Sequence, residues 1–216
     1  IPIPQLTYGQ AIADITAREG QFLKDGLATV ANLKPHIQPW TTYTPLNFFA
    51  IIFCMMVGTA SLPHILMRYF TTPSVREARQ SVAWSLFFIF LLYFSAPAYA
   101  AFSKLEVYTN IIGREVSQIR PWMFTWGELG LIQVCGKNAA SLQAVIDACK
   151  AVGTFLVHLQ AVVINTDVIV LSTPEIAGLP YVISGLVAAG GLAAALSTAD
   201  GLLLTIANAL SHDFYY

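Results

Sequence analysis

Long apolar segments alternate with polar connections along this chain. The run "LNFFAIIFCMMVGTASLPHILM" at 46–67 and the run "VAWSLFFIFLLYFSAPAYAAF" at 82–102 contain no charged residue, and a third run stays uncharged from Leu179 to Asp200. A helix of about 20 apolar residues, each rising about 1.5 Å, crosses the hydrocarbon core of a bilayer. The pattern therefore predicts an all-α integral membrane protein with three transmembrane helices. The predicted spans are 46–70, 82–102 and 179–211.

The polar connections differ greatly in length. The segment between the first two spans, 71–81, is short, whereas 103–178 is long. Within the long connection, 151–171 is apolar in places, but polar residues including Asp167 interrupt it, and a charge at the bilayer centre is costly. We therefore expect 103–178 to form short helices at the membrane surface instead of a further span.

One of these short helices has a recognisable start. Ser172 or Thr173 supplies a hydroxyl for the N-cap, Pro174 suits the first helical position, and Glu175 suits the first turn. The pattern predicts a helix that begins at these residues.

The basic residues of the short loop predict the orientation. Arg68, Arg76 and Arg79 lie in or beside 71–81, and Glu77 is the acid there. Cytoplasmic loops carry an excess of Arg and Lys, so this loop is predicted to be cytoplasmic. The connections 1–45 and 103–178 then lie outside the cytoplasm, and the end, 212–216, lies inside it.

This topology places Cys135 and Cys149 in an oxidising compartment, where they could form a disulfide that closes a small loop. Two free thiols remain the alternative, because spacing alone does not prove a pairing. Cys54, inside the first span, is expected to be a small buried hydrophobic residue.

Composition supports a membrane protein and excludes several other classes. Of the 216 residues, 56% are hydrophobic and 11% charged, and the net charge is -1. Such a chain has no basic face for nucleic acid. It has no Cys and His spacing for a structural metal, and no catalytic or phosphate-binding motif, so neither an enzyme nor an organic cofactor is expected. The chain lacks an initiating Met and a signal peptide, and we expect it to be a piece of a longer protein.

The first span contains residues that should interrupt a helix. Pro63 cannot donate to the carbonyl of Thr59, so the helix should kink or break between Gly58 and Pro63. Ser61 could then cap the half-helix that follows, and the N-terminal dipole of that half-helix would attract a carboxylate. The alternative is a kink satisfied by neighbouring helices. His64 is expected to be a packed, hydrogen-bonded side chain, and Arg68 to extend to the cytoplasmic surface.

The third span carries a stripe of small and polar residues within a sector of roughly 100°. One interpretation is a seam for close helix packing. The other is a cation site, in which hydroxyls and backbone carbonyls surround an ion such as Na+. Asp200 must face protein or water, or else lie solvated at the cytoplasmic mouth, and its role stays open. The residues of the stripe are Gly190, Ala194, Ser197, Thr198, Gly201, Thr205, Asn208 and His212.

Three stretches resemble the sodium:solute symporter family, most closely its acetate or monocarboxylate permease-like bacterial members. They are "GTASLPHILMRYF" at 58–70, "TTPSVREARQS" at 71–81 and "GLAAALSTADGLLLTIANALSHDFYY" at 191–216. The resemblance implies a leucine-transporter fold with two inverted five-helix repeats, in which these spans are the sixth, seventh and eighth core helices. It also implies a place in a bacterial inner membrane, beside the lipid bilayer and the remaining helices of a full-length transporter.

The resemblance further implies site residues. The family's coupling Na+ would be bound by the Ser197 and Thr198 hydroxyls and the Ala194 carbonyl, with the other ligands on a helix that this chain lacks. The broken sixth helix contacts the solute in this fold. The residues expected there are Gly58, Thr59, Ser61 and His64.

The function implied is Na+-coupled import of a small organic solute, such as the short monocarboxylate acetate. Two alternatives remain open at this point: a transporter-like membrane domain of a sensor, and a structural membrane subunit in which the stripe only packs helices.

Overall fold

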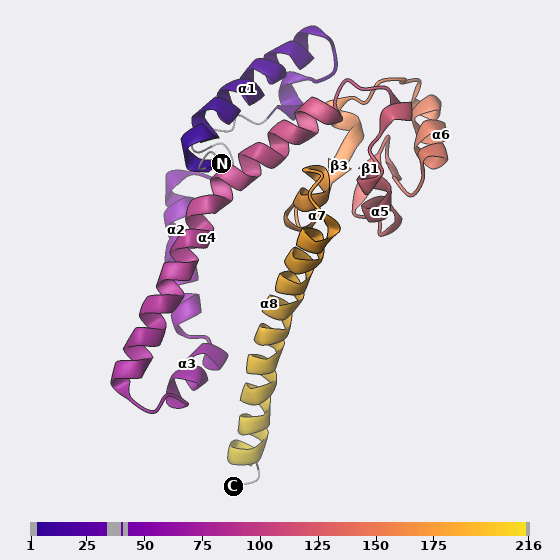
Figure 1. Ribbon diagram of the computed structural model, residues 1–216. Helices are drawn as coiled ribbons and strands as arrows, with labels where there is room; N and C mark the ends of the chain where they lie inside the picture. The colour runs from indigo at the N-terminus through magenta and orange to yellow at the C-terminus, as the bar shows by residue number, and fades with distance from the viewer. Residues whose placement is uncertain (1–3, 34–39, 41–42, 215–216) are drawn as a thin grey trace. The chain divides into compact units, whose positions relative to one another are not determined.

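The computed structural model describes residues 4–33, 40 and 43–214 (Figure 1). Parts of the predicted connections 1–45 and 212–216 thus lie outside the described residues. The structure divides into two compact units, unit 1 with residues 1–36 and 93–188, and unit 2 with residues 37–92 and 189–216. The long helices α4 (Val75–Asn110) and α8 (Tyr181–Asn208) contribute residues to both units.

The described residues contain the apolar helices that the hydrophobic pattern predicts. The helices α4 and α8 are each long and apolar enough to cross a membrane, and α2 (Pro45–Ala60) with α3 (Pro63–Phe70) forms a pair bent by 47° that passes the same test together. The described residues thus contain two candidate spans, or three if the bent pair forms one span, and α4 extends beyond the predicted span 82–102 at both ends. At its C-terminal end α8 continues into a short π-helical segment, Ala209–Phe214.

The α4 helix exposes large apolar side chains on successive residues. Phe88 is 62% exposed, Phe90 65% and Leu92 64%. A helix that is apolar all round requires lipid or further protein around it, because water would leave this surface unfavourably hydrated. The helical content and these apolar surfaces indicate a membrane protein.

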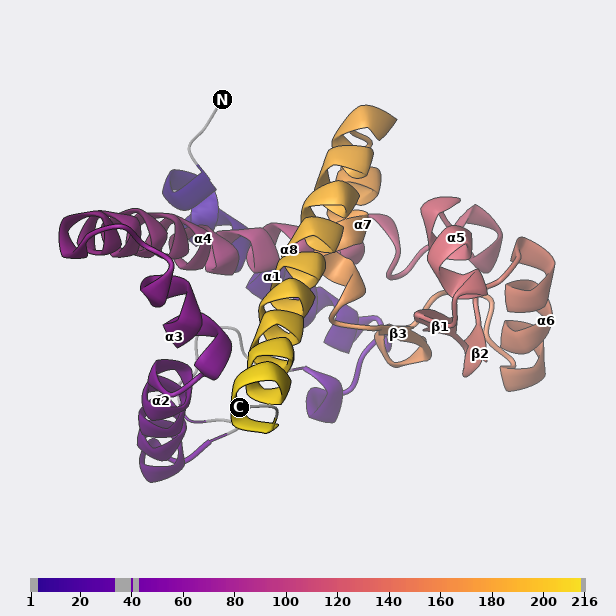
Figure 2. The ribbon, with the colours of Figure 1, turned by 90° about the horizontal axis from the view of Figure 1, so that it is seen from below.

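Unit 1 contains α1, the second half of α4 and a small α/β region. Its core is built from fully buried side chains such as Ile15, Met123 and Val145. Figure 2 shows α5, α6 and the three strands gathered together in this region. The elements of unit 1 besides α4 and α8 are α1 (Pro4–Lys24), η1 (Val30–Asn32), η2 (Val116–Gln118), α5 (Trp122–Glu128), β1 (Ile132–Val134), β2 (Lys137–Asn138), α6 (Leu142–Val152), η3 (Leu159–Ala161), β3 (Val162–Ile164) and α7 (Val168–Ile176).

The strands form an antiparallel sheet in the order β2-β1-β3, which the sequence did not predict. Strands of two or three residues are too short to show an alternating pattern, so the expectation of helices alone in 103–178 was incomplete. Cys135 and Gly136 connect β1 to β2, and both have positive φ, 52° and 76°. Two such residues are typical of a type I′ hairpin turn, in which the second position favours Gly.

The two unit 1 cysteines form a disulfide, which decides between the two alternatives left open by the sequence. Cys135 in the hairpin turn is bonded to Cys149 on α6, with a Cα–Cα distance of 5.2 Å. Cys149 is almost fully buried. The expectation that Cys54 is buried is wrong within unit 2, where it is exposed on α2.

The predicted start of a helix at Ser172 to Pro174 is also wrong. The helix α7 begins earlier, at Val168, and Pro174 lies inside it. Proline removes the N–H that would pair with the carbonyl of Val170, but the hydroxyl of Tyr99 donates to that carbonyl at 2.9 Å. A tertiary hydrogen bond therefore replaces the missing helical one.

Candidate functional site

The predicted break in the first span is confirmed, and it lies between Ala60 and Pro63. The helix α2 ends at Ala60, Ser61 is its C-cap, and Leu62 is the N-cap of α3. The Ser61 hydroxyl donates to the carbonyl of Gly58 at 3.0 Å. The prediction that Ser61 caps α3 is therefore wrong, because its side chain satisfies the last turn of α2 instead.

The start of α3 consequently has no side-chain cap. The backbone carbonyl of Leu62 accepts from the N–H groups of Ile65 and Leu66 at 3.1 and 3.2 Å. The predicted solute-contacting residues Gly58, Thr59 and Ser61 lie together at this break, and all three are exposed. Exposed polar groups next to an uncapped helix start are suited to binding an anion.

His64 and Arg68 follow the break, one turn apart on the same face of α3. The Nδ1 atom of His64 is buried and has no hydrogen-bond partner among the described residues. The expectation that His64 is hydrogen-bonded packing is thus only half correct, because the side chain is packed but this nitrogen is unpaired.

Arg68 is exposed and contacts α8 within unit 2, a contact that the sequence did not predict. Its Nη2 atom donates to the carbonyl oxygen of Ser197 at 2.7 Å and to the Ser197 hydroxyl at 3.4 Å. A helical carbonyl has a second lone pair beyond its intrahelical bond, so it can accept this donor without breaking the helix. The contact joins residues 129 positions apart in the sequence.

Gly201, one turn after Ser197, makes this contact sterically possible. A Cβ atom added to Gly201 would lie 3.2 Å from Nη2 of Arg68 and 3.4 Å from the Cβ of His64. Gly201 is also the buried residue of α8. This part of the predicted stripe therefore packs closely against α3, as the helix-seam interpretation expects.

The three residues predicted to bind Na+ lie on adjacent turns of α8. Thr198 donates its hydroxyl to the carbonyl of Ala194 at 3.2 Å, and both oxygens of Ser197 accept from Arg68. All three supply neutral oxygens, which is the donor chemistry that a hard monovalent cation needs. Asp200 is exposed beside them. No pattern in the sequence indicated that Arg68 would contact these residues.

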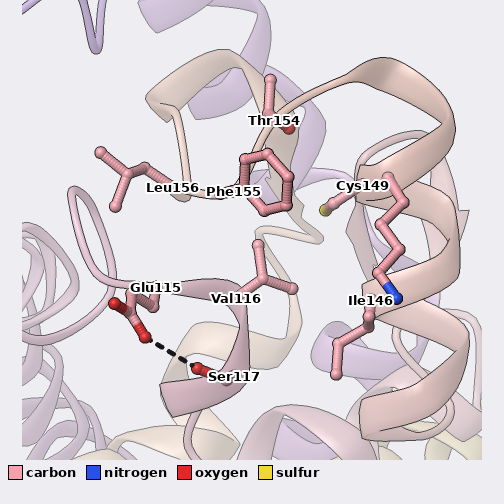
Figure 3. Close-up of a pocket in the computed structure, with 9 residues that line it drawn as sticks. Glu115, Val116, Ser117, Ile146, Cys149, Thr154, Phe155 and Leu156 are labelled. Carbon is pink, nitrogen blue, oxygen red and sulfur yellow. Dashed lines mark hydrogen bonds between the residues drawn. The ribbon is translucent and has the colours of Figure 1, made fainter.

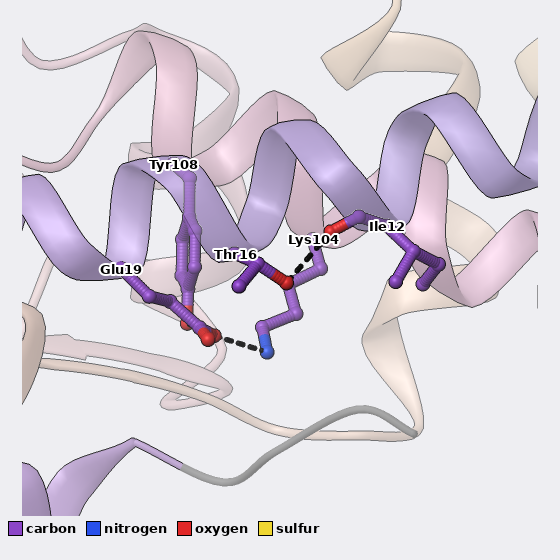
Figure 4. A network of polar contacts seen from close by, with 5 residues as sticks. All are labelled: Ile12, Thr16, Glu19, Lys104 and Tyr108. Atoms are coloured by element: carbon purple, nitrogen blue, oxygen red, sulfur yellow. Dashed lines mark hydrogen bonds and ion pairs between the residues drawn. The ribbon is translucent and has the colours of Figure 1, made fainter.

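A second polar cluster joins α1 to α4 in unit 1 (Figure 4). The Lys104 ammonium lies 2.7 Å from the Glu19 carboxylate, and the Tyr108 hydroxyl donates to the same oxygen at 3.2 Å. Tyr108 lies beyond the apolar segment 82–102, and its burial, followed by the nearby Glu19 charge, raises its pKa. Tyr108 therefore stays protonated as a donor, and the cluster anchors α1 on α4.

The α/β region has a shallow cavity beside the disulfide, with a volume of about 400 Å³ (Figure 3). Glu115 accepts a hydrogen bond from Ser117 at 3.1 Å on one side, and Phe155 and Cys149 line it elsewhere. Among the described residues no group of three or more His, Cys, Asp or Glu side chains could hold a metal ion.

Two of the curated proteins that match this chain are named as a symporter and a transporter. An uncharacterised symporter of Cupriavidus necator is 53% identical over 171 residues, which are 79% of this chain and 23% of that protein. The chain is homologous to part of a membrane transporter. The monocarboxylic acid transporter of Corynebacterium glutamicum is 42% identical over 87 residues, which are 38% of this chain and 14% of that protein.

The chain thus spans less than a quarter of the length of either relative. No family profile matches the chain, and no solved structure matches it. The transporter homology agrees with the apolar helices and with the broken helix pair of unit 2.

Proposed function

We propose that this chain is part of a Na+-coupled symporter that imports a short monocarboxylate such as acetate across a bacterial inner membrane. The observation that carries the proposal is the 53% identity to a symporter over 79% of the chain. The match to a monocarboxylic acid transporter supports the class of solute. The leucine-transporter fold is part of the same proposal.

The proposed Na+ site uses the carbonyl of Ala194 and the hydroxyls of Ser197 and Thr198. These groups are on one stretch of α8, and the remaining ligands would come from helices outside this chain. Na+ bound there would favour one arrangement of the transporter over another, and the sodium gradient would then drive uptake.

The proposed solute site is the break between α2 and α3, with Gly58, Thr59, Ser61 and His64. The uncapped start of α3 supports this assignment, because the positive end of the helix dipole attracts a carboxylate. The disulfide supports placing 103–178 outside the cytoplasm, because such bonds persist in oxidising compartments.

The test is uptake of labelled acetate, and then of other short monocarboxylates, by vesicles that hold the full-length protein. External Na+ is replaced by K+ at constant ionic strength. We expect uptake to fall to the level of empty vesicles in K+. Uptake that ignores the replacement would exclude sodium coupling.

One observation favours a second candidate, a structural role for the stripe. Gly201 packs on His64 and Arg68, as a purely structural seam would require. This candidate predicts that Ser197→Ala with Thr198→Ala leaves sodium-dependent uptake unchanged, whereas the sodium site predicts a weaker dependence on Na+.

A further inference from the structure

The Arg68 guanidinium contacts one of the oxygens that the proposed sodium site requires, the Ser197 hydroxyl, and the carbonyl oxygen of the same residue. Its Nη2 atom is 2.7 Å from the Ser197 carbonyl oxygen and 3.4 Å from the Ser197 hydroxyl oxygen. The hydroxyl is one of the proposed Na+ ligands. The positively charged side chain of Arg68 therefore lies beside the position proposed for Na+.

Na+ and the Arg68 guanidinium could not both bind Ser197 without weakening each other. A hard cation binds oxygen ligands at about 2.4 Å, so an ion on the Ser197 hydroxyl would lie no more than about 6 Å from Nη2. Two like charges at this separation repel each other, and away from bulk water they are poorly screened. An ion on Ser197 and the Arg68 contact would each weaken the other.

The packing around the contact shows that α8 is shaped to receive Arg68. Gly201 leaves the space that a Cβ atom would take, 3.2 Å from Nη2 and 3.7 Å from Nε of Arg68. The hydrogen bond itself holds the C-terminal turn of α3 on α8. Release of Arg68 would therefore free α3, which follows the helix break, from α8.

We propose that Arg68 is a tethered competitor of Na+: it holds α3 on α8 through Ser197 when the ion is absent, and Na+ binding releases it. This inference rests on the proposed sodium site. Competition between Arg68 and Na+ would make the movement of α3 depend on the ion. By linkage, a stronger contact between Arg68 and Ser197 would lower the apparent affinity for Na+. Arg68 is a positioning residue here, because it acts on the ion through Ser197.

The first experiment measures release of Arg68 without measuring transport. The full-length protein in vesicles is treated with phenylglyoxal, which modifies arginine, in Na+ or in K+, and the modified sites are quantified by mass spectrometry. We expect Na+ to speed modification of Arg68 several-fold and to leave Arg76, an exposed arginine on α4, unchanged. The variant Ser197→Ala with Thr198→Ala should abolish the Na+ effect.

The second experiment measures the Na+ concentration that gives half-maximal uptake. The variant Arg68→Gln removes the competing charge, so this concentration should fall about tenfold, as expected when one charge-assisted hydrogen bond no longer opposes the ion. Arg68→Lys keeps the positive charge, so its half-maximal Na+ concentration should stay closer to that of the wild type. The control variant Arg76→Gln should not change it.

The outcomes separate this inference from the proposed function. If uptake depends on Na+ but Arg68 is modified equally fast in Na+ and K+, the competition is overturned and sodium coupling stands. If Arg68→Gln raises the half-maximal Na+ concentration, Arg68 supports the site and does not compete for it. If Na+ speeds modification of Arg68 while uptake ignores Na+, the ion site and its competitor stand and the sodium-coupled function fails. If neither the modification of Arg68 nor the uptake responds to Na+, the competition and the sodium-coupled function are both overturned.

Discussion

Removing the Cys135–Cys149 disulfide should loosen the α/β region of unit 1 by an amount that its loop length predicts. The bond joins a hairpin turn to α6 across a sequence separation of 14. Closing a loop of this length lowers the entropy of the open chain, which stabilises the closed form by about 3 kcal/mol. In the variant Cys135→Ala with Cys149→Ala, the closed form of this region should be less stable by about this amount.

The loss should appear as local opening, because the bond lies within one packed cluster. Cys149 and Val145 of α6 are each 1% exposed, and Ile132 and Val134 of β1 are fully buried. Detaching the hairpin from α6 exposes this cluster to solvent. A loss of about 3 kcal/mol raises the open fraction by roughly 150-fold.

Limited proteolysis of the full-length protein in detergent measures this fraction. When opening and closing are fast compared with cleavage, the cleavage rate follows the population of the open form. Cleavage sites within 112–178 are identified by mass spectrometry, and the rate there should rise on the order of a hundredfold. Reduced wild-type protein should behave like the double variant, and Cys54→Ala should behave like the oxidised wild type.

Cleavage of the double variant in this segment at a rate within about threefold of the wild type would contradict the expected loss of stability. Packing of the sheet against α6 would then hold the region closed without the covalent bond. Equal cleavage of the reduced and oxidised wild type would lead to the same conclusion.

Other substitutions have equally definite expected outcomes. Gly127→Ala should destabilise unit 1 by about 3 kcal/mol in a thermal-shift assay, because its Cβ would lie 2.0 Å from a backbone carbonyl oxygen. Gly9→Ala, with no atom within 4 Å, is the control and should stabilise α1 by about 0.5–1 kcal/mol. Ser197→Ala with Thr198→Ala should raise the Na+ concentration for half-maximal uptake about tenfold or more, whereas no change would favour a packing seam. Glu19→Gln removes a partly exposed ion pair and should cost only about 0.5–1 kcal/mol in the same thermal-shift assay; a loss several times larger would show that the pair is more important than its exposure suggests.

The three candidate spans could be predicted because their cause is local. Long uncharged runs require an apolar environment whatever surrounds them, and Pro63 must interrupt a helix because it has no N–H to donate. The helix break was therefore found at the correct residues. The function of the stripe on α8 could not be decided in the same way, since small and polar residues suit both a seam and an ion site.

Contacts between distant residues were beyond the sequence pattern. Pro174 is accepted inside α7 because the hydroxyl of Tyr99 donates to the carbonyl of Val170, which the proline leaves without a helical donor. The short strands of the sheet have too few residues for a periodic signal. Each of these features depends on a partner that local propensity does not specify.

The sequence by itself indicated a helical membrane protein, its candidate spans and the break in the first of them, because hydrophobicity and proline chemistry act within a few residues. Only the tertiary structure decided that Cys135 pairs with Cys149 and that Arg68 binds Ser197 beside Gly201. Those contacts depend on which distant surfaces meet and on the space that a missing side chain leaves, and both are properties of packing between helices.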